Sequence, residues 1–201
     1  VVTLTIPVPS GTVAGDLIIY AVSDDGSGIF TWPPGFTELQ RTDVNFPDEQ
    51  AWAIAYKVAD GSETNLSFSD NDSWTASGSV LVYSGVSTTS PINGSNKINS
   101  GSTSSPWTLN SASLTTTLPN TQLVWFSAAD VDNTSSGFNG SGCTTKVTTY
   151  TPPSGFTKRA DIQGLVDPYT CFNPMAVADA PQAAAGATGV LVGGLVSSVG
   201  G

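Results

Sequence analysis

The chain has no histidine, only six basic residues and only two cysteines among its 201 residues. Histidine is the usual general base and the commonest metal ligand, so its absence removes the most frequent arrangements of both kinds of site. With a net charge of −10, the chain has no means of neutralising a run of phosphates. We therefore expect no nucleic acid and no membrane among its partners, since an anionic membrane surface would repel it.

Charged side chains are also scarce, at 11% of the sequence against roughly 25% in typical soluble domains. Ser, Thr and Asn supply the polarity, and 21 glycines and 13 prolines supply turns. No stretch longer than about ten residues shows the apolar stripe of an amphipathic helix. The uncharged segment 183–201 has a compact apolar part far shorter than the ~20 residues of a membrane span, which predicts a terminal strand. The composition predicts an all-β chain.

The two cysteines, Cys143 and Cys171, enclose a stretch rich in turn residues. They could form a disulfide, which would imply an oxidising setting, or they could be two separate thiols. Two cysteines provide too little pattern to decide, so both alternatives stay open.

Alternating apolar residues predict the strands. The opening "VVTLTIPV" places Val2, Leu4, Ile6 and Val8 on one face, and an apolar run follows at 17–23. The segment "QAWAIAYKVA" at 50–59 alternates large side chains with alanines. Such small residues on one face indicate close approach of another layer or a tight fit to solvent.

One corner occurs twice. Thr31–Gln40 reads "TWPPGFTELQ" and Thr151–Ala160 reads "TPPSGFTKRA". A Pro-Gly turn is rigid, so Phe36 and Phe156 can each be fixed over the open end of a β-sandwich. We favour this structural role over the alternative, an aromatic contact with a ligand.

The segments around the corner also repeat. "TQLVWFSAAD" corresponds to "DLIIYAVSDD", "NPMAVAD" to "QAWAIAY", and "ATGVLVGGLVS" to "ASGSVLVYSGVS". We predict a single domain over 1–201, an antiparallel, jelly-roll-like β-sandwich with an internal repeat of about 1–90 and 107–201 and a polar crossover at 87–106. The halves would close face to face, because each alone holds under ~100 residues and few bulky apolar side chains.

Three acidic clusters are candidates for a metal site, because calcium prefers several oxygen ligands from flexible loops. None has the full spacing of a calcium loop, and Asp and Asn are ordinary turn residues, so solvated turns are the favoured interpretation. We predict no metal and no cofactor. The candidates are Asp24, Asp25, Asp130, Asp132, Asp70 and Asp72.

No catalytic residues are predicted. A serine nucleophile would have no histidine partner, and Cys143 has no histidine to activate it. Paired carboxylates could serve glycoside hydrolysis, but the sequence does not show their separation. We expect a protein that is not an enzyme, with a weak hydrolase built on acidic loops as a distant alternative.

Three tryptophans lie near turns, Trp32, Trp74 and Trp107, and are candidates for exposed contacts with a sugar or with a protein neighbour. Trp52 and Trp125 fall within strand patterns, which predicts core or sheet-face positions.

An ordered series of motifs carries a resemblance: "IPVPSGTVAGDLIIYAVS", "PPGFTEL", "AIAYKVADGSE", "LVYSGVSTTSPIN" and "DAPQAAAGATG". Over nearly the whole chain it resembles a β-sandwich module of bacterial surface proteins and of virion proteins of tailed phages, cyanophages among them. The ending "VLVGGLVSSVGG" departs from similar modules, which continue through a more polar strand. This apolar, glycine-rich ending could form a surface for subunit contact.

The resemblance implies a role in assembly or adhesion and brings no catalytic residues. We expect a capsid decoration (cement) protein at the virion surface, with the major capsid protein or other virion proteins as partners and with self-association, for example as a trimer. The alternative is a secreted or tail-associated module, extracellular, that binds carbohydrate and has a glycan as partner.

Overall fold

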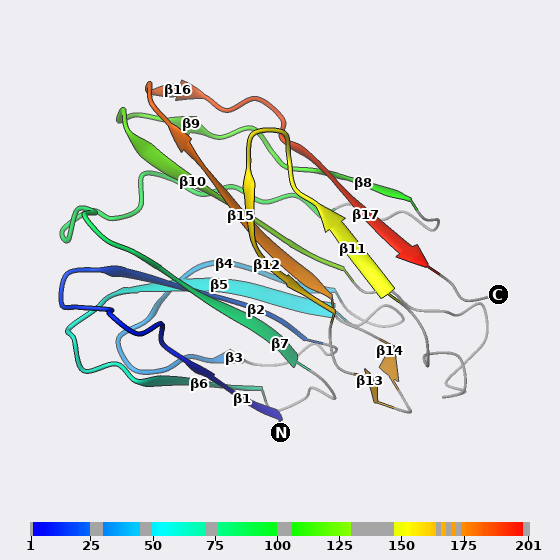
Figure 1. The fold of residues 1–201 in the computed structure, drawn as a ribbon, viewed down its shortest axis with the longest axis horizontal. Helices are drawn as coiled ribbons and strands as arrows, with labels where there is room; N and C mark the ends of the chain where they lie inside the picture. The colour runs from blue at the N-terminus through cyan, green and yellow to red at the C-terminus, as the bar shows by residue number, and fades with distance from the viewer. Residues whose placement is uncertain are drawn as a thin grey trace. The chain divides into compact units, whose positions relative to one another are not determined.

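The computed structural model describes residues 2–24, 30–44, 50–70, 76–99, 106–129, 147–163, 166–167, 170–171 and 174–198. Every regular element in these residues is a β-strand, and every strand pair is antiparallel (Figure 1). The all-β prediction is confirmed.

The chain divides into two compact units, Val1–Pro91 and Ile92–Gly201. The division falls inside the polar stretch at 87–106. Unit 1 has a four-stranded sheet of order β4-β5-β2-β7 and a three-stranded sheet of order β1-β6-β3. The strands of unit 1 are β1 Val2–Pro7, β2 Leu17–Asp24, β3 Phe30–Thr31, β4 Thr37–Val44, β5 Gln50–Val58, β6 Asn65–Asp70 and β7 Ala76–Tyr83.

Unit 2 has two three-stranded sheets, of order β10-β15-β12 and β11-β17-β8, and two short strand pairs, β13-β14 and β16-β9. Its strands are β8 Trp107–Asn110, β9 Thr115–Thr116, β10 Thr121–Ala128, β11 Val147–Thr151, β12 Thr157–Ile162, β13 Val166–Asp167, β14 Thr170–Cys171, β15 Met175–Gln182, β16 Gly186–Ala187 and β17 Val192–Ser198.

Each unit has a core between its two main sheets. In unit 1, Tyr20 of β2 and Phe68 of β6 are fully buried in one cluster, with the alanines Ala51 and Ala53 of β5. In unit 2, Trp125 of β10 and Leu195 of β17 belong to one cluster with alanines of β15. The sequence argument held that a half could bury its apolar face only against the other half, but each unit has an interior of its own. The joining of both units into one jelly-roll-like sandwich stays a prediction.

The two units share strand order and register. The order β4-β5-β2 recurs as β12-β15-β10, and the order β1-β6-β3 recurs as β8-β17-β11. Even the irregularity is shared, because the register shifts between Glu38 and Gln40 in β4 and between Lys158 and Ala160 in β12. A bulge at the same place in both units lets each residue of one unit be assigned its counterpart in the other.

The last correspondence drawn from the sequence is wrong. It matched the final apolar segment with β7, but β17 lies between β11 and β8 just as β6 lies between β3 and β1. An apolar run fits any buried strand, and only its hydrogen-bonded neighbours distinguish one buried strand from another. Among the described residues, no strand of unit 2 takes the place next to β10 that β7 takes next to β2.

The repeated corner forms the same turn in both units. The backbone N–H of Phe36 donates to the carbonyl of Pro33 at 3.3 Å, and that of Phe156 donates to Pro153 at 3.0 Å. The intervening glycines have φ of 85° and 83°, the left-handed region that glycine enters without strain. Both phenylalanines pack against the core of their unit, as the sequence predicts.

The two cores differ at two neighbouring positions, where side chains of different size replace one another. The shared register places Trp125 at the position of Tyr20 and Gly193 at the position of Phe68. A Cβ on Gly193 would lie 2.8 Å from Cζ2 of Trp125 and 3.0 Å from the carbonyl oxygen of Thr151. The larger indole therefore lies where the side chain of residue 193 would begin, and Gly193 has no room for a side chain.

We predict that Gly193→Ala destabilises unit 2 by about 1–3 kcal/mol, because the new methyl group overlaps Trp125 and a backbone oxygen that cannot easily move. The matched control is Gly194→Ala, whose Cβ would meet its nearest neighbour at 3.7 Å. Thermal or denaturant unfolding of the two variants measures the difference. Equal stability of both variants would contradict this description of the core.

Candidate functional site

Several residues singled out from the sequence lie outside the described residues, namely Asp25, Asp72, Asp130, Asp132, Trp74 and Cys143. Cys171 lies in β14, where the side chain is not described. The disulfide and the paired acidic loops of the hydrolase alternative therefore stay predictions.

The two described aspartates of the acidic clusters are not in solvated turns. Asp24 ends β2 and Asp70 ends β6, and both side chains are fully buried. The favoured interpretation of these two residues was wrong, because an Asp at the end of a strand pattern fits the last position of the strand as well as the first position of a turn. No group of three potential metal-ligating side chains occurs in the described part of the chain.

The tryptophans near turns do not form an exposed platform in the described residues. Trp32 packs in the aromatic cluster of unit 1, with its ring centroid 5.7 Å from that of Tyr20 and 5.5 Å from that of Phe68. Its Nε1 donates a hydrogen bond to Oε2 of Glu38 at 2.8 Å. Trp107 is half-buried and packs against the core of unit 2. Both contribute mainly to packing.

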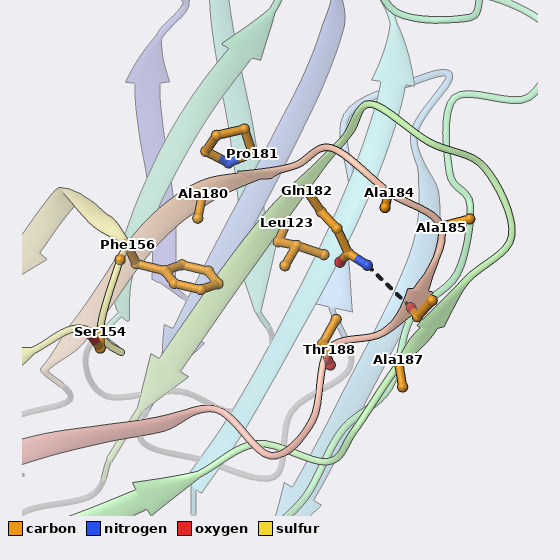
Figure 2. A pocket seen from close by; sticks show the side chains of 12 residues that line it. Leu123, Ser154, Phe156, Ala180, Pro181, Gln182, Ala184, Ala185, Ala187 and Thr188 are labelled. Atoms are coloured by element: carbon orange, nitrogen blue, oxygen red, sulfur yellow. Dashed lines mark hydrogen bonds between the residues drawn. The ribbon is translucent and has the colours of Figure 1, made fainter.

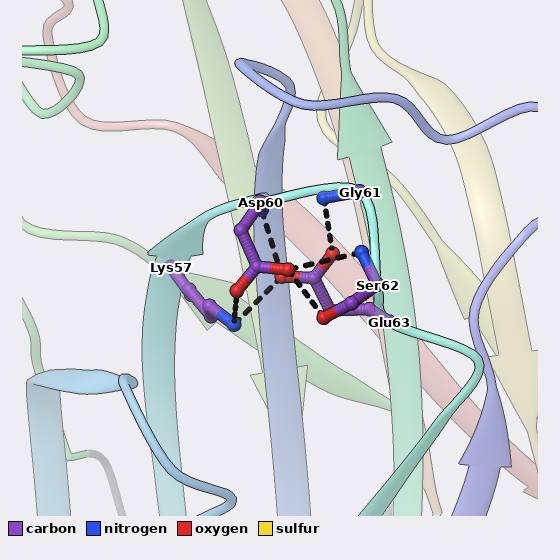
Figure 3. Close-up of polar contacts among 5 residues, drawn as sticks. All are labelled: Lys57, Asp60, Gly61, Ser62 and Glu63. Atoms are coloured by element: carbon purple, nitrogen blue, oxygen red, sulfur yellow. Dashed lines mark hydrogen bonds and ion pairs between the residues drawn. The ribbon is translucent and has the colours of Figure 1, made fainter.

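A charged cluster fastens the loop after β5 in unit 1 (Figure 3). Lys57 Nζ lies 2.7 Å from Oε1 of Glu63 and 2.9 Å from Oδ2 of Asp60. Glu63 also accepts hydrogen bonds from the backbone N–H groups of Asp60 and Gly61, both at 3.0 Å. The backbone and hydroxyl of Ser62 donate to Asp60. Every charge of the loop thus has a partner, which indicates a structural role.

The same contacts shift the pKa values of the cluster. A hydrogen bond from the Ser62 hydroxyl, with that from Lys57, holds the pKa of Asp60 well below its usual range. Burial alone would raise the pKa of Glu63, but hydrogen bonds from Lys57 and from backbone N–H groups outweigh it and lower that pKa. The hydrogen bond to Glu63, joined by that to Asp60, raises the pKa of Lys57. All three groups are therefore held in their charged forms at neutral pH.

Unit 2 has a shallow, open pocket of about 480 Å³ where its proline-glycine corner meets the end of β15 (Figure 2). The corner contributes Ser154, Gly155 and Phe156, and β10 contributes Leu123. The end of β15 and the segment after it complete the wall with Ala180, Pro181, Gln182, Ala184, Ala185, Gly186, Ala187 and Thr188. Phe156 was singled out from the sequence; the remaining lining residues were not, since small uncharged residues give no signal until the strands are paired.

The outer face of the sheet β11-β17-β8 carries two exposed valines and no charge in the described residues. On β17, Val192 and Val196 are 52% and 49% exposed, whereas Leu195 is 1% exposed and belongs to the core. Their cross-strand partners are polar and exposed, with Val192 opposite Asn110 and Val196 opposite Thr149. This is the ending for which the sequence suggested a contact surface.

No protein-family model, curated protein or solved structure matches this chain. In the part of the chain that the structure describes, no helix is long and apolar enough to cross a membrane.

We predict that Lys57→Met lowers the stability of unit 1 by about 1–2 kcal/mol at pH 7, because Met keeps the apolar stem and leaves Glu63 without its cation. The pKa values of Asp60 and Glu63 are lowered in the folded state, so their contribution is present above the unfolded values near 4 and is lost as the pH falls.

The stability gap between the wild-type chain and Lys57→Met should accordingly shrink between pH 7 and pH 2, as measured by denaturant titration. Lys97→Met, at an exposed position, serves as the control. A gap that stays constant with pH would show that the charges of this loop do not stabilise it.

Proposed function

We propose that this chain is a non-enzymatic structural protein of a phage virion that decorates or cements the capsid through protein–protein contacts. Its partner is the major capsid protein, and its place is the virion surface. Two things support the proposal. One is the ordered series of motifs that resembles a virion module, and the other is the outer face of β11-β17-β8. The second observation carries the argument, because it supplies a contact surface.

The chemistry of this face suits a permanent contact. The chain carries a net charge of −10, so an acidic face would repel an acidic neighbour. Here the described outward residues are Val, Gly, Thr and Asn, which bring no charge to be desolvated. Valine and threonine are stiff at χ1, so they lose little rotamer freedom on burial. The strands hold these side chains in a fixed pattern, which favours binding by shape and buried area.

The described charged residues near the two corners are engaged within the fold. Asp60 and Glu63 hold Lys57, and Arg159 Nε donates to Oδ1 of Asp179 at 2.9 Å. The Lys57 cluster is poorly suited to transfer protons to a substrate, because the pKa shifts of its three members hold each of them in the charged form. Assembly is the function that makes use of this exposed, uncharged face, and self-association, for example as a trimer, is a part of this proposal.

We predict that the wild-type chain sediments with capsids assembled without it, and that the double variant Val192→Lys/Val196→Lys binds at least tenfold more weakly. Both valines are about half exposed, so the lysines should disturb the fold little while adding two charges that the contact would have to desolvate. Co-sedimentation over a range of concentrations measures the affinity, and analytical ultracentrifugation measures self-association.

Val13→Lys is the matched control, because Val13 is 58% exposed but lies in unit 1. Its binding should equal that of the wild-type chain. If the double variant binds as well as the control, the face is not the contact. If the wild-type chain ignores capsids and stays monomeric at high concentration, the proposed function is wrong.

A further inference from the structure

The sheet β10-β15-β12 of unit 2 has one strand fewer than its counterpart in unit 1. There, β2 pairs with β5 along one edge and with β7 along the other, each time over all the residues 17–24. In unit 2, β10 takes the place of β2 and pairs with β15 over its whole length, 121–128. No described strand pairs with the other edge of β10, which we call the open edge. The counterpart in unit 1 shows which partner such an edge fits, namely an antiparallel strand of the same length.

The backbone hydrogen bonds that join β10 to described segments all run to one side. Beyond the ends of the strand, the N–H of Asn120 donates to the carbonyl of Ala183 at 3.1 Å, and that of Ala129 donates to Pro174 at 3.2 Å. Both acceptors flank β15. In an antiparallel sheet, alternate residues of a strand bond to opposite neighbours, so half of the residues of β10 direct their N–H and C=O groups to the open edge. These groups are a template for a further strand.

The side chains of β10 are also less covered than those of β2. Ile18 and Ile19 of β2 are 0% and 7% exposed, and β7 lies beside both of them. Their counterparts in the shared register, Leu123 and Val124, are only half-buried. A strand on the open edge would therefore remove apolar surface from water in addition to forming backbone hydrogen bonds.

β10 lacks the features that discourage pairing at the other edge of the same sheet. That edge is β12, which carries Lys158, Arg159 and Asp161 and is interrupted by a bulge. Charges and bulges of this kind hinder the association of one sheet edge with another. In contrast, β10 reads "TQLVWFSA", with no charge, no proline and no shift of register against β15. A long edge strand without such protection is a pairing site.

The absence of charge favours a second copy of this chain as the partner. Each copy carries a net charge of −10, so a contact through acidic surfaces would bring like charges together. Two β10 strands side by side bring none. A strand that pairs with its own copy across a two-fold axis is antiparallel, which is the direction that β7 takes beside β2. The second copy thus offers a strand of the required length, direction and charge.

We propose that two copies of this chain pair through their β10 strands and join their sheets into one, of order β12-β15-β10-β10-β15-β12. The charged and bulged β12 then lies at both outer ends, so the assembly closes at two copies. The proposal goes beyond the capsid contact and does not depend on it, because β10 and β17 belong to different sheets.

Hydrogen exchange of the whole chain at increasing concentration tests this pairing. Amides that point to the open edge should be protected only in the dimer. Exchange of amides within 121–128 should therefore slow at least tenfold between about 1 μM and about 1 mM, since we expect a Kd in the micromolar range. Amides within 157–162, on β12, should exchange at the same rate throughout. Analytical ultracentrifugation measures the dimer in parallel.

Gln122→Lys should weaken dimerisation at least tenfold, because it adds a charge to each of two adjacent strands. Gln122 is exposed, so the fold should tolerate the lysine. The matched control is Thr157→Lys, which changes the net charge equally and is also exposed but lies in β12. This control should dimerise as the wild-type chain does.

The double variant Val192→Lys/Val196→Lys, which tests the capsid contact, should keep the protection of 121–128. A wild-type chain that dimerises through β10 but does not bind capsids would contradict the proposed function and not this pairing. The pairing is overturned if the chain stays monomeric at about 1 mM, or if a dimer forms without protection of 121–128. It is also overturned if that protection occurs only on capsids, since the edge would then bind a strand of the capsid protein.

Discussion

Both cores depend on a middle strand that presents alanine to the interior. Ala51 and Ala53 of β5 and Ala176 and Ala178 of β15 are all fully buried and belong to the core clusters. The neighbouring strand, the opposite sheet and the corner bring in aromatic rings, and the small alanine side chains leave room for them. In unit 1 this space admits Tyr20, whose ring lies edge-on to three neighbouring aromatic rings. A larger residue in place of any of these four alanines would displace the aromatic rings of the core, because no empty space is left for it.

Local pattern was sufficient to predict the strands and the corners, but not how they pair. Alternation at Val2, Leu4 and Ile6 predicts β1, and two prolines before a glycine predict the turn at Phe36, because both signals are local. The counterpart of β17 was misassigned, since pairing with β8 and β11 is long-range and apolar runs resemble one another. The buried state of Asp24 was missed for a related reason: burial at a strand end depends on neighbours distant in sequence.

The candidate sites also depend on long-range contacts that local sequence patterns do not show. Phe156 was found from its motif, but the pocket beside it is defined by a side chain that is missing, Ala180 in place of Lys57. The exchange itself follows from the correspondence of "QAWAIAY" with "NPMAVAD", whose next residues are Lys57 and Ala180. That it opens the corner depends on the packing of Lys57 over Gly35, which is a long-range contact. In contrast, the apolar ending with Val192 and Val196 was noticed from the sequence, because a run of valines and glycines is unusual in a chain so rich in Ser, Thr and Asn. The structure shows that both valines are about half exposed.

The two units keep the same strand pairing, and they differ in the size or charge of side chains at equivalent positions. Phe68 becomes Gly193 while Tyr20 becomes Trp125, whose indole lies directly against Gly193. Lys57 becomes Ala180 with no compensating enlargement nearby, because Gly155 and the alanines after β15 stay small. A buried core cannot leave such an exchange uncompensated without a cavity, whereas a surface corner can. The uncompensated exchange is therefore the place where the corner of unit 2 lies open and that of unit 1 is covered by a lysine stem.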